Sequence, residues 1–238
     1  MRTALPAYRA AAAELAPLLR LGGDGSVLAI DGRGAWWEWL DGAAGVVVDE
    51  PDPAPAPVHE MLRAIDVPVV VVRRRLRADI VADAAREPID PRHVVVDAWG
   101  GRTDAMTLLR DATGWARVLA GGALSVIDRA DTPSASMIAL RGPDGVGVSV
   151  TRAIGGGVGG ALVATALGAR RVEVRVDSAT PLVDVVFDDE AGRRATPLRR
   201  ESPERLGLRR ILQALESGTV PSDLAELAAD DEVIRHPL

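Results

Sequence analysis

The chain has 238 residues, a formal net charge of −6 at pH 7 and no cysteine. This length suits one large domain or two small ones, the charge argues against a general nucleic-acid binder, and the missing cysteine excludes disulfides, thiolate catalysis and cysteine-ligated metals. Since apolar runs do not approach the ~20 residues of a membrane span, we expect a cytoplasmic protein that has neither nucleic acid nor membrane as a partner.

Helix-like and strand-like runs alternate over the first hundred residues. Helical patterns are expected at 5–20, 34–40, 58–65, 76–85 and 103–112. Valine-rich strands are expected at 26–30, 45–50, 68–73 and 93–99. Continuous apolar strands separated by helices predict a parallel sheet that is covered on both faces. We therefore predict a shortened, Rossmann-like α/β domain over residues 1–99.

The second half of the chain is rich in strands and predicts an α+β open-sheet domain over residues 100–238. Strand-like runs follow one another from Ala116 to about Leu198, with P-D-G and E-A-G turns between some of them. A strong helix is expected at 201–218, where Ser202 is the candidate N-cap, Pro203 fits the first helical position and Gly218 fits the position after the end. A last short helix follows.

A glycine-rich stretch offers one candidate nucleotide site. Gly155, Gly157 and Gly160 fit G-x-G-x-x-G, a strand-like run precedes them, and the helix-compatible run ALVATALGA and Asp177 follow. This order is typical of a dinucleotide-binding turn, and NAD or NADP would be its ligand. The alternative is a glycine-rich bend between strands of the second sheet. The short helical run, which contains a glycine and two β-branched residues, favours the bend.

The run Arg73, Arg74 and Arg75 lies where a predicted parallel strand ends. Ligands of open α/β sheets bind at this edge, and guanidinium groups bind carboxylates and phosphates in a bidentate manner. An anionic small molecule is therefore one candidate ligand, and a solvated charge run paired with nearby acids is the other interpretation. No metal site is expected, because His59, His93 and His236 are scattered without ligand spacing.

Lysine is absent, so all 28 basic residues are arginine. This absence excludes a Schiff base, a P-loop lysine and a Tyr-Lys proton relay. Arginine does not replace lysine in these roles, because its guanidinium keeps its proton near neutral pH.

The segment from Gly45 to Ala85 resembles the glucose-fructose oxidoreductase/inositol dehydrogenase family. Pro51 lies at the proline of the family's Thr-Pro, residues 67–69 at its Gly-Lys-His, and Arg73–Arg75 at its Glu-Lys-Pro, followed by Leu76. The later order of strand, helix, β-rich stretch and terminal helices also resembles the family, from about Ser26 onward. The resemblance implies a nucleotide-binding domain followed by an open-sheet domain.

Departures from the family pattern decide the functional hypotheses. The family's catalytic lysine position holds Arg74, the opening strand–GxGxxG–helix unit has no room before residue 26, and no Asp/His pair matches. We therefore expect an oxidoreductase-like protein without hydride transfer, cofactor or catalytic residue, acting as a binding or subunit-like protein. Its expected partner is a second copy, in a dimer through the second-domain sheet. The alternative is an NAD(P)-dependent oxidoreductase for a sugar or polyol-like substrate.

Overall fold

The structure, a computed structural model, describes four stretches of the chain: residues 5–15, 26–155, 160–177 and 182–236. Two units form, the first from residues 1–77 and 200–228 and the second from residues 78–199 and 229–238. The predicted boundary after residue 99 lies inside the second unit. Residues 200–228 belong to the first unit again, so a single boundary along the sequence does not separate the two units.

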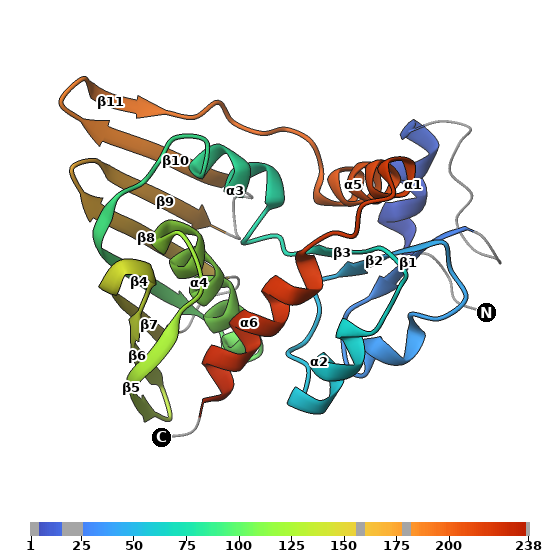
Figure 1. Ribbon diagram of the computed structural model, residues 1–238, viewed down its shortest axis with the longest axis horizontal. Helices are drawn as coiled ribbons and strands as arrows, with labels where there is room; N and C mark the ends of the chain where they lie inside the picture. Colours follow the sequence, from blue (N-terminus) through green and yellow to red (C-terminus); the bar gives the residue numbers. More distant parts are fainter. Residues whose placement is uncertain (1–4, 16–25, 156–159, 178–181, 237–238) are drawn as a thin grey trace. The chain divides into compact units, whose positions relative to one another are not determined.

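A three-stranded parallel sheet, here called the parallel sheet, lies at the centre of the first unit (Figure 1). Its strands, in spatial order, are β1 (Val27–Asp31), β2 (Gly45–Asp49) and β3 (Val69–Val72). Val46, Val47 and Val48 are all fully buried although their side chains alternate between the two faces. This burial confirms the predicted parallel sheet with two covered faces.

Helices cover both faces of the parallel sheet. On one face, Tyr8 of α1 (Pro6–Leu15) and Ile211 of α5 (Pro203–Ser217) belong to the same core as Val47. The other face carries η1 (Trp36–Trp39), α2 (Ala56–Arg63) and the start of α6 (Asp223–Arg235). The predicted ends of α5 are confirmed, since Ser202 accepts the Arg205 amide and Gly218 has a φ of 64°.

The second unit contains an eight-stranded sheet, here called the large sheet. Its spatial order is β11-β10-β9-β8-β4-β7-β6-β5, and within it only β4 and β7 pair in parallel among the described residues. The strands are β4 (Pro91–Gly100), β5 (Ser125–Thr132), β6 (Ala135–Arg141), β7 (Gly147–Ile154), β8 (Gly160–Gly168), β9 (Arg171–Asp177), β10 (Leu182–Asp189) and β11 (Gly192–Ala195). A short turn, η2 (Pro143–Gly145), joins β6 to β7.

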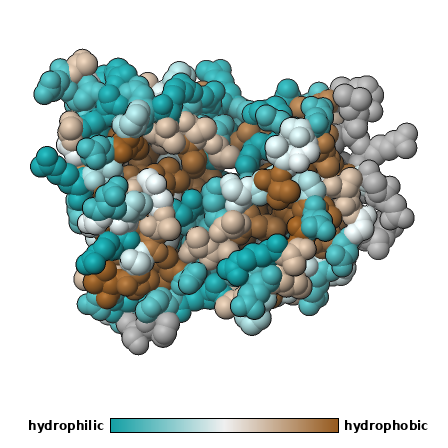
Figure 2. All heavy atoms as spheres, in the orientation of Figure 1, coloured by the Kyte–Doolittle hydropathy of each residue, from teal (hydrophilic) through white to brown (hydrophobic). Residues whose placement is uncertain are grey.

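One face of the large sheet is covered by helices. The long helix α4 (Ala105–Ala120) packs on β4, β7 and β8, and α3 (Ala78–Ala84) lies against β10. The expectation of a strand from Ala116 onward is therefore wrong for the first residues, because Ala116–Ala120 complete α4 and are buried with it. Hydrophobic residues also reach the visible surface in the region of β5 (Figure 2), where Ile127 is 55% exposed.

The opposite face of the large sheet, here called the open face, carries exposed apolar side chains. Val94, Val96 and Ala98 of β4 are buried toward α4, so Trp99, which is 48% exposed, points to the other side. Met137 and Leu167, also on this side by their strand register, are 55% and 42% exposed. The open face is thus a mixed surface of small, apolar and charged residues.

Candidate functional site

The carboxyl ends of β1, β2 and β3 meet at one edge of the parallel sheet, because the strands run in the same direction. This carboxyl edge is formed by residues 31–34, 49–52 and 73–75, all within the first unit. Open α/β sheets bind their ligands at this edge. It is therefore the place where the first unit would hold a ligand.

A tight glycine turn follows β1 at residues 31–34. A Cβ atom on Gly32 would lie 2.3 Å from Cα of Pro51, so no other residue fits there without moving the backbone. The Gly32 amide donates to the Asp49 carbonyl at 2.8 Å. Gly34 has a φ of 64°, and a Cβ placed on it would meet nothing within 4 Å. The turn is thus closed against β2 at Gly32 and open at Gly34.

Sequence reasoning missed this turn. The signal was available, since Gly32-Arg33-Gly34 is a G-x-G directly after a predicted strand. A strand followed by a glycine turn is therefore present before β2. The four-residue η1 stands where a long helix would follow.

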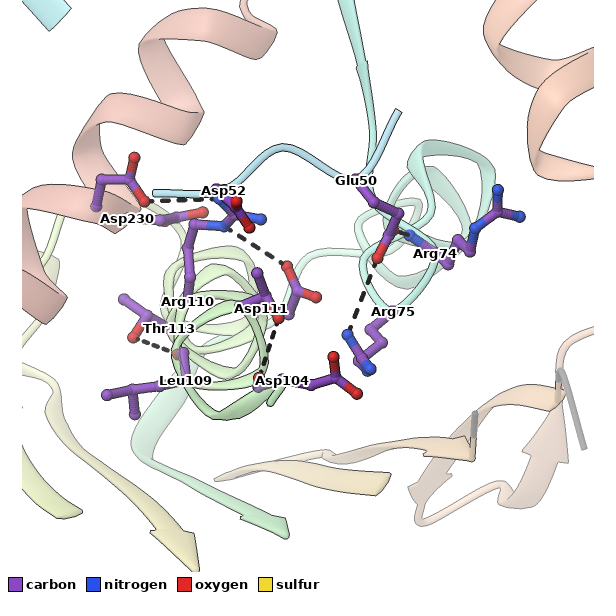
Figure 3. A network of polar contacts seen from close by, with 12 residues as sticks. Glu50, Asp52, Arg74, Arg75, Asp104, Leu109, Arg110, Asp111, Thr113 and Asp230 are labelled. Atoms are coloured by element: carbon purple, nitrogen blue, oxygen red, sulfur yellow. Dashed lines mark hydrogen bonds and ion pairs between the residues drawn. The ribbon is translucent and has the colours of Figure 1, made fainter. Parts of the chain in front are cut away.

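Carboxylates of the chain accept the backbone amides of this edge. Oδ1 of Asp31 accepts the Arg33 amide at 3.1 Å, and Oδ2 of Asp52 accepts the Gly34 amide at 2.8 Å. The Glu50 side chain accepts the amide of Arg74 and lies 3.9 Å from the Arg75 guanidinium (Figure 3). Acidic side chains therefore accept backbone amides after β1 and after β3, whereas the Glu50 and Asp52 amides after β2 donate to backbone carbonyls.

The predicted arginine run lies at this edge, but its members have different surroundings. Arg73 and Arg75 are buried, at 7% and 9% exposure, whereas the Arg74 side chain is 43% exposed. Arg74 binds Asp49 at 3.0 Å and Glu204 at 2.8 Å. The pairing of Arg74 with two acids agrees with the interpretation of the run as charges paired with nearby acids. The burial of Arg73 and Arg75 shows that these two arginines are not solvated. Binding of an external anion stays a prediction.

Buried polar groups surround the Arg74 side chain. The hydroxyl of Tyr8, which is fully buried, donates to Oδ1 of Asp49 at 3.2 Å. Burial raises the pKa of Asp49 even though Arg74 opposes the change. The pKa of Glu204 is lowered. Burial favours its protonated form, but hydrogen bonds from the backbone and from Arg74 stabilise the carboxylate more strongly. The Tyr8 pKa is raised by burial and by Asp49, so this phenol keeps its proton at neutral pH.

The nucleotide site predicted at Gly155, Gly157 and Gly160 does not have the structure that such a site requires. A dinucleotide turn needs a helix after the glycines, but Gly160 to Gly168 form β8, paired with β4 and β9. The helix expected at this point is therefore wrong. Gly155 follows β7, Asp177 ends β9, and Gly157 lies outside the described residues. The segment joins two strands of the large sheet, as the alternative interpretation expected.

Buried charges in the second unit connect α4 with the end of α6. Arg117 binds Asp230 at 2.8 Å, and a guanidinium nitrogen of Arg110 lies 3.8 Å from Asp231. Both carboxylates are almost fully buried. Removing one partner of such a pair leaves a buried charge, which is strongly destabilising. We assign these pairs a structural role.

The described residues contain neither a metal-ligand cluster nor a membrane-spanning helix. No cluster of three or more metal-ligating side chains occurs among them. Likewise, none of the helices in these stretches has the length and apolar character needed to cross a membrane.

Comparisons with known proteins identify the fold. No protein-family model and no curated protein matches the chain. Among solved structures, a dehydrogenase (MviM) from Clostridium difficile matches 89% of this chain and 77% of its own, with 11% identity and a TM-score of 0.63. A 3-ketoreductase, KijD10 from Actinomadura kijaniata, solved with TDP-benzene and NADP, matches 89% of this chain and 75% of its own, with 16% identity and a TM-score of 0.63. The chain has the fold of these dehydrogenases.

A further dehydrogenase has a similar score. UDP-N-acetylglucosamine 3-dehydrogenase GnnA from Acidithiobacillus ferrooxidans matches 80% of this chain and 68% of its own, with 9% identity and a TM-score of 0.62. The resemblance read from the sequence is thus confirmed for the fold, a Rossmann-like parallel sheet plus a larger mixed sheet. The expectation that the chain takes no cofactor is contradicted, because structures of this fold hold NADP.

Proposed function

We propose that this chain is an NAD(P)-dependent oxidoreductase that acts on a sugar or polyol-like substrate. The observation that carries the proposal is the glycine turn at the carboxyl edge, where Gly32 leaves no space for a Cβ atom. Pro51 fills the space beside Gly32, but Gly34 faces open space, and a glycine there lets a pyrophosphate approach the backbone of the turn closely. The NADP bound in the KijD10 structure and the nucleotide sugar in the name of GnnA support the same choice of cofactor and substrate.

The residues at the edge fit the phosphate part of such a cofactor. The Gly34 amide would hold one of its oxygens in place of the Asp52 carboxylate, and the exposed Arg33 side chain would supply positive charge. The nicotinamide of a bound cofactor supplies the hydride chemistry. Arg74 keeps its proton, so we assign it charge stabilisation and positioning rather than proton transfer. The proposal also keeps Arg73, Arg74 and Arg75 as the contacts of an anionic substrate group.

A charge placed in the turn tests the cofactor site. Gly34→Asp adds a carboxylate where the Cβ faces open space, and we expect it to weaken NADP binding at least about tenfold by like-charge repulsion. Gly42→Asp is the matched control. Gly42 has a similar φ of 79° and similar open space, but it precedes β2 instead of following β1.

Calorimetry with NAD and NADP measures the effect. Binding by the wild type and the Gly42→Asp variant, with loss in Gly34→Asp, supports the site. Equal binding by both variants would place the cofactor elsewhere. A wild type that binds neither nucleotide at millimolar concentration would contradict the proposed function.

The open face of the large sheet leads to a proposal about assembly. We propose that two copies of the chain pair through this face, since Trp99, Met137 and Leu167 expose apolar surface on it. Met137→Arg should then produce a monomer in sedimentation experiments. Met61→Arg changes a residue of α2 that is similarly exposed, at 46%, and should leave the dimer intact. A monomeric wild type at high concentration would contradict the proposal.

A further inference from the structure

The Asp52 carboxylate occupies the donor that a cofactor phosphate would use. Its Oδ2 atom accepts the Gly34 amide at 2.8 Å, and this amide belongs to the open side of the glycine turn. Successive backbone N–H groups in turns form concavities that bind anions such as phosphate. A carboxylate and a phosphate oxygen cannot both accept this hydrogen.

Asp52 is held in this position by contacts on both sides of its backbone. Its amide donates to the Gly32 carbonyl at 2.7 Å, and its carbonyl accepts the Trp36 indole at 3.1 Å. Trp36 is fully buried, so the indole is a fixed donor. The Asp52 backbone is therefore anchored to the turn, and its side chain reaches Gly34 without rearrangement of the loop.

We propose that Asp52 is a specificity-determining residue of the carboxyl edge, which competes with a phosphate group for the Gly34 amide. This inference rests on the proposed function, because it takes the glycine turn as the phosphate site. A phosphate must displace the Asp52 carboxylate and then remain close to its charge. The turn should accordingly bind phosphate-containing ligands more weakly than its donors alone would allow.

Two substitutions separate the hydrogen bond from the charge. Asp52→Asn removes the charge but keeps an oxygen acceptor, whereas Asp52→Ala removes both. We expect pyrophosphate to bind about tenfold more tightly to Asp52→Ala than to the wild type, with Asp52→Asn between them. Asp41→Asn is the matched control. It removes one charge from an exposed aspartate that precedes β2, and it should leave the affinity unchanged.

Calorimetric titrations with inorganic pyrophosphate and with NADP distinguish the possible results. The role of Asp52 is supported if pyrophosphate binds most tightly to Asp52→Ala, less tightly to Asp52→Asn and most weakly to the wild type. This result supports the inference even where NADP binds none of the proteins and the proposed function fails. Equal affinity in all three proteins would overturn it, even where NADP binds and the proposed function stands. If thermal melting shows that the alanine variant does not fold, the asparagine variant alone decides, and an affinity equal to that of the wild type overturns the inference.

Discussion

The Tyr8 hydroxyl donates a hydrogen bond of 3.2 Å to Asp49, joining α1 to the carboxyl end of β2. Residues 41 positions apart in the chain are thereby linked beside the Arg74 side chain. Burial raises the pKa of Asp49, so the folded state disfavours the ionised form of this carboxyl group. Each hydrogen bond donated to the carboxylate therefore contributes to the stability of the fold. The first two predictions concern this group.

Tyr8→Phe removes the hydroxyl and leaves the ring in the core. We expect a loss of about 1 kcal/mol in the free energy of unfolding, because a half-buried carboxylate loses one of its donors. Urea denaturation of the variant and the wild type measures the difference. Identical stability would show that Arg74 alone satisfies Asp49.

Arg74→Lys tests the paired contacts of the guanidinium group. Arg74 reaches Asp49 with one terminal nitrogen and Glu204 with the other, and an ammonium group lacks this fork. We expect a loss of about 1–2 kcal/mol in the free energy of unfolding. Arg33→Lys, at an exposed position of the same edge, should change it by less than about 0.5 kcal/mol. Equal effects of the two substitutions would argue against the paired role.

Asp83 should make the second unit sensitive to acid. The hydrogen bond from Arg199 lowers the pKa of this buried carboxyl, with Arg86 adding to the effect. The unfolded chain therefore takes up the proton first as the pH falls. The stabilisation is present above the ordinary aspartate value of about 3.9 and is lost as the pH falls through the lower folded value.

Arg199→Gln should accordingly destabilise the protein at pH 7 and have a smaller effect at pH 3. Thermal melting of the variant and the wild type at both pH values measures the two differences. A deficit of the same size at pH 3 would mean that Arg199 contributes through packing and not through the ionised Asp83.

Gly207 allows α5 to lie close to the parallel sheet. A Cβ atom there would be 2.7 Å from Cγ2 of Val72 and 3.2 Å from Cγ1 of Val47. We expect Gly207→Ala to destabilise the protein by about 1–3 kcal/mol through overpacking, despite the better helix propensity of alanine. Gln213→Ala on the exposed side of α5 should be nearly neutral in the same denaturation experiment. A more stable Gly207→Ala variant would refute the close approach.

Much of the secondary structure could be predicted from local patterns. The valine runs of β2 and β3 have no polar residue to expose, so burial on both faces followed directly. Ser202, Pro203 and Gly218 determine the ends of α5 through capping and backbone preferences that act within a few residues. The run that became β8 was ambiguous, because its short apolar alternation also fits a helix, and pairing with β4 and β9 decided it.

The sequence by itself therefore determined the order of elements from α1 to β4, the parallel sheet and the chemistry that cannot occur without cysteine or lysine. Tertiary structure decided which charges meet. Asp49, Arg74 and Glu204 lie far apart in the chain, and only the common direction of the strands and the position of α5 bring them together. The same holds for Gly32 and Pro51, whose close contact leaves no space for a Cβ atom on Gly32, since contact between loops depends on strand register.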